Sequence, residues 1–145
     1  MAEKAKVLVV ANRTAESPEL LEALKRRAQA GECEFMLLVP STPHGITWAA
    51  DMHAGGEEAE AHRRAFVEEL RGEGLDVREA KVGDPDPLAA VQDEVNFEQY
   101  DEVIVSTLPL HISKWLRVDL PRKAKAATGL PVTHVVASEA KAPAN

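Results

Sequence analysis

The sequence has little of what several protein classes require. Of its 145 residues only one, Cys33, is cysteine, and 4% are aromatic. A single thiol excludes an internal disulfide framework and suits a reducing compartment. No apolar run approaches the about 20 residues that a membrane-spanning helix needs. The residues before the first apolar run, 1–6, lack the apolar core of a signal peptide, so we expect a cytoplasmic protein without a membrane partner.

A surplus of basic residues is also absent. Lysine and arginine number 17 against 24 aspartate and glutamate residues, which gives a formal net charge of −7. Proteins that bind DNA or RNA mainly by neutralising phosphates are usually basic. The composition therefore argues against a nucleic-acid partner.

The common catalytic and nucleotide-binding motifs are missing as well. The sequence contains no G-x-G-x-x-G, no Walker glycine–lysine loop and no G-x-S-x-G elbow. None of the five histidines pairs with another at the spacing of metal ligands with a supporting carboxylate. Cys33 has no neighbouring histidine or lysine to activate it, so a buried, inert thiol is expected. No catalytic residue and no metal site are predicted, and an enzyme is the function with the weakest support.

Short apolar runs alternate with longer amphipathic segments along the whole chain. This alternation predicts a single α/β domain over residues 1–138, followed by a polar tail at 139–145. Right-handed crossovers favour a doubly wound parallel sheet, with the first and fourth strands as its central pair. Strands are predicted at 7–11, 35–39, 75–82, 102–107 and 131–137, with helical segments between them.

The boundaries of several helices can be predicted from single residues. Ser17 and Asp86 each precede a proline, the combination expected of a helix cap and the first helical position. Gly31 is expected to end the first helix in a left-handed conformation. Pro121 is expected to break the helical segment 112–128 into two pieces, because its ring clashes with the preceding turn.

Polar residues follow the first predicted strand at the place where ligands bind in such sheets, beyond the carboxyl ends of the strands. The amide of Asn12 can bond a ribose hydroxyl or an adenine edge, and Arg13 can hold an anion. Thr14 adds a hydroxyl. The structural alternative is that Asn12 fits the turn geometry and Arg13 is solvated.

A second polar group follows the fourth strand. Ser106 and Thr107 end that strand, and Ser113 and Lys114 follow where a helix is expected to begin, a position that favours anions. No glycine occurs between residues 84 and 128, whereas a close approach of backbone to phosphate usually requires one. Structural packing of this loop is therefore the alternative to phosphate binding.

Five segments together carry a resemblance to a known family. They are the strand 7–11 with a polar residue after it, the strand end Val39-Pro40, the turn Gly83-Asp84-Pro85 before a helix, the strand 103–107, and Leu130-Pro131-Val132 before the last strand. The chain resembles the universal stress protein family over nearly its whole length. The Gly-Asp-Pro step and the Leu-Pro-Val ending are the more specific of these features.

The resemblance implies an adenine nucleotide alpha hydrolase-like fold, with strand order 3-2-1-4-5 and helices on both faces. It also implies a homodimer formed through the last strand, Val132 to Ala137. Members that bind ATP have an aspartate where this chain has Asn12, and they hold adenine near the position of Val39. They hold phosphates with a glycine motif after the fourth strand, where Ser106 and Pro109 stand here.

These observations predict a cytosolic regulatory or stress-response module with a cleft for an adenine nucleotide, and ATP, ADP or AMP are the candidate ligands. The alternative is a homodimeric interaction protein that binds no nucleotide and has no catalytic activity. The predicted cofactor-binding residues are Asn12, Arg13, Thr14, Val39, Ser106, Thr107, Ser113 and Lys114.

Overall fold

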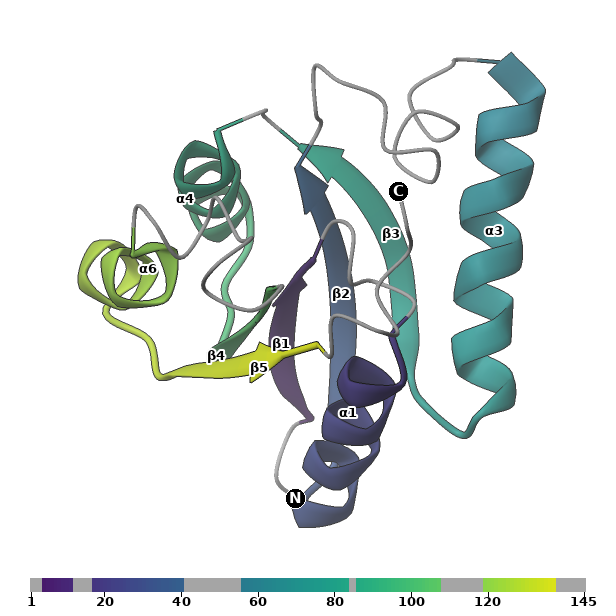
Figure 1. The fold of residues 1–145 in the computed structure, drawn as a ribbon, viewed down its shortest axis with the longest axis horizontal. Helices are drawn as coiled ribbons and strands as arrows, with labels where there is room; N and C mark the ends of the chain where they lie inside the picture. Colours follow the sequence, from purple (N-terminus) through teal and green to yellow (C-terminus); the bar gives the residue numbers. More distant parts are fainter. Residues whose placement is uncertain (1–3, 12–16, 41–55, 84–85, 108–118, 138–145) are drawn as a thin grey trace.

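A computed structural model describes residues 4–11, 17–40, 56–83, 86–107 and 119–137. Strands and helices alternate along the chain (Figure 1). The strands are β1 (Ala5–Val10), β2 (Cys33–Pro40), β3 (Val77–Gly83), β4 (Glu102–Thr107) and β5 (Val132–Val136). The helices are α1 (Pro18–Ala30), α3 (Gly56–Gly72), α4 (Pro87–Phe97) and α6 (Leu120–Thr128).

The five strands form one parallel sheet in the order β3-β2-β1-β4-β5. Val10, near the end of β1, lies opposite Leu38 of β2 on one side and opposite Val105 of β4 on the other. The predicted doubly wound sheet, its strand order and its central pair are therefore confirmed. β1 and β4 each contain a continuous apolar run, which is typical of strands that are buried on both faces in the middle of a parallel sheet.

Alternation along β1 divides the core between the two faces of the sheet. Val7 and Val9 pack on one face under α1 and α3, and Leu8 and Val10 pack on the other under α4 and α6. In Figure 1, α4 and α6 lie together, well away from α1 and α3. The chain therefore winds helices onto both faces of the sheet.

Side-chain caps fix the starts of α1 and α4 as predicted. The hydroxyl of Ser17 accepts a hydrogen bond from the backbone N–H of Leu20 at 3.2 Å. A carboxylate oxygen of Asp86 accepts one from the N–H of Leu88 at 3.1 Å. In both helices a proline follows the cap, where its missing N–H costs nothing because no intrahelical acceptor is available there.

The helix ends differ from one another. Gly129 ends α6 with a φ of 73°, in the left-handed region. Gly31 ends α1 with a φ of 165°, which is extended backbone, so the left-handed conformation predicted for it is wrong. The chain needs no reversal there: it enters β2 two residues later, and Arg27 donates to the Gly31 carbonyl at 3.2 Å. Pro121 lies in the first turn of α6.

Several predictions fall on parts of the chain outside the described residues. These are the helical residues before position 119 and the polar tail at 139–145. Among the helices that the structure does describe, none combines the length and the apolar character needed to cross a lipid bilayer.

Candidate functional site

The carboxyl ends of β1, β4 and β5 lie side by side at one end of the sheet. Ala11, directly after β1, is completely buried, and its N–H donates to the Leu38 carbonyl at 3.1 Å. The N–H of Ala137, directly after β5, donates to the Thr107 carbonyl at 2.8 Å. The chain thus leaves β1 beside the end of β4, and this is where such sheets bind ligands.

Ser106 and Thr107 place two hydroxyl groups at the carboxyl end of β4, on opposite faces of the sheet. Successive side chains of a strand alternate, so Thr107 shares the α4/α6 face with Val105, and Ser106 shares the other face with Ile104. Both are 2% exposed or less. Burying a hydroxyl costs free energy unless it is hydrogen-bonded, so such a pair is retained where it serves structure or binding.

His134 is a hydrogen-bond partner of Thr107. Its Nε2 lies 2.8 Å from Thr107 Oγ1, and His134 stands opposite Val105 in the β4–β5 register. His134 is an exposed residue, and partial desolvation of its ring lowers the pKa of the imidazole, which favours the neutral form at pH 7. A neutral imidazole has one donor and one acceptor nitrogen, so His134 can hold the Thr107 hydroxyl in a fixed orientation.

Sequence reasoning missed His134 as a residue beside the carboxyl end of β4. The only signal was the period of two along β5, which places residues 132, 134 and 136 on one face. That signal becomes useful only with the register between β4 and β5, and no pattern in the sequence gives that register.

The other predicted site residues are placed as follows. Val39 has a fully buried side chain in the α1/α3 core, opposite Val82, so only its backbone can face a ligand. The remaining predicted residues lie outside the described part of the chain; they are Asn12, Arg13, Thr14, Ser113 and Lys114.

A separate groove of about 460 Å³ lies between α4 and the ends of β2 and β3. Leu38 and Ala90 form part of its apolar lining, and Phe97 stands at its rim with 74% of its surface exposed. The Lys81 ammonium lies 4.3 Å from the centre of the Phe97 ring, within the range of a cation–π contact. Sequence reasoning did not identify this groove.

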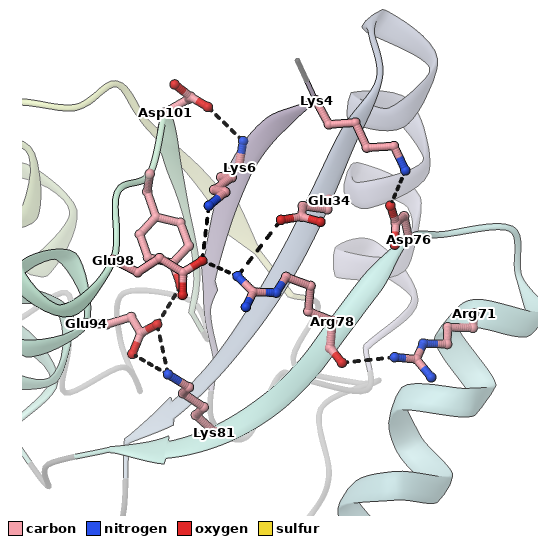
Figure 2. A network of polar contacts seen from close by, with 11 residues as sticks. Lys4, Lys6, Glu34, Arg71, Asp76, Arg78, Lys81, Glu94, Glu98 and Asp101 are labelled. Atoms are coloured by element: carbon pink, nitrogen blue, oxygen red, sulfur yellow. Dashed lines mark hydrogen bonds and ion pairs between the residues drawn. The ribbon is translucent and has the colours of Figure 1, made fainter.

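The polar side chains of Lys81, Glu94 and Tyr100 beside this groove contact one another. Glu94 is 6% exposed and accepts a hydrogen bond from the Tyr100 hydroxyl at 2.5 Å, while Lys81 Nζ lies 3.3 Å from each of its oxygens (Figure 2). Burial and this carboxylate raise the pKa of the Tyr100 phenol, so the hydroxyl stays a donor. Both Glu94 oxygens therefore have partners, and the cluster stabilises the packing of α4 on the sheet.

The described residues offer little for metal or thiol chemistry. Among them, no group of three or more histidine, cysteine, aspartate or glutamate residues is arranged to hold a metal ion. Cys33 is buried as predicted, and burial raises the pKa of its thiol. A thiol that stays protonated is a poor nucleophile.

A parallel sheet in this order, with helices on both faces, defines the class of doubly wound α/β domains. Solved structures place it more narrowly. The chain has the fold of the universal stress proteins, and the resemblance predicted from the sequence is confirmed. No family model and no curated protein matches the sequence.

Three of these structures cover almost the whole chain. A universal stress protein from Archaeoglobus fulgidus is 15% identical, with a TM-score of 0.59 over 90% of this chain and 93% of its own. A universal stress protein in complex with cAMP is 17% identical, with a TM-score of 0.60 over 92% and 98%. A family protein from Arabidopsis thaliana with AMP bound is 15% identical, with a TM-score of 0.57 over 97% of each chain.

Proposed function

We propose that this chain is a cytosolic stress-response or regulatory module of the universal stress protein type that binds an adenine nucleotide where β1 and β4 end. The observation that carries the proposal is the pairing of these two strands, which puts Ala11 and Thr107 at the same end of the sheet. Solved proteins of the same fold contain AMP, dAMP or cAMP.

Each candidate residue has a role that fits its chemistry. Asn12 bonds the ribose, and the backbone at Val39 borders the adenine. The Thr107 hydroxyl, oriented by His134, donates to the phosphate. Arg13 supplies positive charge, and Thr14, Ser106, Ser113 and Lys114 complete the set of donors.

The missing glycines favour a ligand with few phosphates. Because no glycine occurs between residues 84 and 128, a Cβ stands at every position that borders the phosphates on this side. One phosphate can be held by side-chain donors alone, whereas a triphosphate needs a longer stretch of close backbone. We therefore expect AMP or cAMP to bind more tightly than ATP.

Thermal denaturation in the presence of AMP, cAMP, ADP and ATP tests this function. A ligand that binds only the folded state raises its stability by RT ln(1 + [L]/Kd), about 2.7 kcal/mol at a hundredfold excess over Kd. Asn12→Ala should weaken the affinity about fivefold, since one hydrogen bond contributes about 1 kcal/mol. Asn96→Ala, at an exposed position of α4, is the matched control. Melting curves that stay unchanged at millimolar nucleotide would exclude the proposal.

A second candidate, a nucleotide-independent homodimeric interaction protein, is favoured by the open edge of β5. The Pro131 carbonyl and the Ala137 N–H both bond β4, so backbone groups at even positions from 132 to 136 point away from the sheet. Val136 is 46% exposed on this strand. An edge of this kind is a template for pairing with the same strand of a second copy.

Val136→Pro tests this dimer, because proline removes an outward N–H and is tolerated on an edge strand. If the last strands pair, the mass measured by light scattering should fall from dimer to monomer. Val136→Thr keeps the N–H and should stay dimeric. A wild-type monomer at all concentrations would exclude the dimer without bearing on nucleotide binding.

A further inference from the structure

The opposite edge of the sheet, formed by β3, carries an unusual side-chain contact. Arg71 lies at the end of α3, and its guanidinium donates to the backbone carbonyls of Val77 at 2.8 Å and Arg78 at 2.9 Å. A third bond, to a Glu68 carboxylate oxygen at 2.9 Å, holds the guanidinium in place. Figure 2 shows Arg71 reaching the carbonyl of Arg78 from α3.

A β-bulge explains why two consecutive carbonyls accept bonds from the same side. Phe35 of β2 lies opposite Val77 and Leu37 lies opposite Ala80, so β3 has one residue more than β2 in this interval. Val77 and Ala80 are both buried in the α1/α3 core although they are three residues apart. The N–H of Phe35 bonds the Asp76 carbonyl, and the extra residue then leaves the next two carbonyls of β3 for Arg71.

Without Arg71, the edge of β3 has the features of a strand that pairs with itself. A twofold axis through Ala80 would set two copies of β3 antiparallel and place Glu79 of each copy opposite Lys81 of the other. Opposite charges directly across an antiparallel pair are favourable. Both residues lie on the side of β3 away from Ala80, which is buried in the core. The edge is therefore complementary in charge to a second copy of itself.

We propose that the outer edge of β3 is a self-pairing surface for a second copy of this chain, and that Arg71 keeps it closed by occupying the carbonyls of Val77 and Arg78. The guanidinium stands in the path of an incoming strand and holds the bulge, and a bulge disrupts the regular ladder that pairing needs. This surface is separate from the edge of β5 and from the nucleotide site.

Arg71→Met tests the proposal, because methionine keeps an apolar stem and removes all three hydrogen bonds. The mass measured by light scattering over a wide range of concentrations should rise relative to that of the wild-type chain, to twice its value for a wild-type monomer and beyond twice for a wild-type dimer paired through β5. Arg26→Met is the matched control: Arg26 is an exposed arginine whose ion pair is with Glu22 of its own helix, and its loss should leave the mass unchanged. A mass for Arg71→Met equal to that of the wild type at every concentration overturns the proposal.

A second substitution separates strand pairing from aggregation of a destabilised chain. Adding Glu79→Lys to Arg71→Met sets a lysine opposite Lys81 and should restore the wild-type mass, whereas adding Glu22→Lys, with the same charge change on α1, should not. Hydrogen exchange should slow at residues 77–83 in the Arg71→Met variant. An increase in mass that Glu79→Lys does not reverse, or faster exchange throughout the chain, also overturns the proposal.

Discussion

Replacing Thr107 by valine perturbs the candidate site with little change of shape, because a methyl group takes the place of the hydroxyl. The substitution removes the 2.8 Å bond to His134 from a side chain that is 2% exposed. A hydrogen bond contributes about 1 kcal/mol, and the cost is about 0.5–1 kcal/mol here because His134 is an exposed residue whose ring can bond water instead. For a chain of this length, that lowers the melting temperature by about 1–4 °C.

Two measurements on this variant separate structure from binding. Thermal denaturation gives the loss of stability, and titration calorimetry with AMP should show about a fivefold weaker affinity if the hydroxyl donates to the phosphate. Thr133→Val makes the same change at an exposed position of β5 and should alter neither quantity. A Thr107→Val variant with unchanged affinity would contradict the phosphate contact of the hydroxyl, and one as stable as the wild type would contradict the contribution of its bond to His134.

Three further predictions concern the packing around the sheet. Tyr100→Phe removes the bond to buried Glu94 and should lower the free energy of unfolding by about 1.5–3 kcal/mol in urea denaturation. Because the folded-state pKa of Tyr100 is raised, this contribution should be full below pH about 10 and decline above it. A difference between the two proteins that stays constant at higher pH would argue against it. Gly83→Ala places a Cβ 3.0 Å from the Ala90 Cβ and should cost about 1–3 kcal/mol by the same measurement, so an unchanged midpoint would contradict the close contact. Buried Cys33 should react with a disulfide reagent far more slowly in the native protein than in urea, and equal rates would show that it is accessible.

The fold could be predicted because its main signals are local. Continuous apolar runs such as 7–11 identify strands covered on both faces, and Ser17 and Asp86 fix helix starts through bonds to residues two or three positions away. The strand order followed from the family resemblance rather than from periodicity. Gly31 was predicted wrongly because a glycine permits several backbone conformations, and the one adopted depends on where the chain goes next.

The site could be predicted only in part, because it depends on contacts between distant segments. The polar residues after β1 and β4 could be identified from their positions at strand ends. The contact between Thr107 and His134 spans 27 positions in sequence and depends on the β4–β5 register. The Arg71 contacts depend on the bulge in β3, which a weakly alternating strand gives no means to locate.

A nucleotide site where β1 and β4 end is tested most directly by following the backbone amides of the labelled protein by NMR during titration with AMP. Saturable shifts are expected at Ala11, Ser106 and Thr107, where β1 and β4 end together, and at His134 beside them. Amides along residues 88–97 of α4, which line the separate groove, should stay unchanged. Shifts confined to that groove, or none at millimolar AMP, would contradict a nucleotide site between the two central strands.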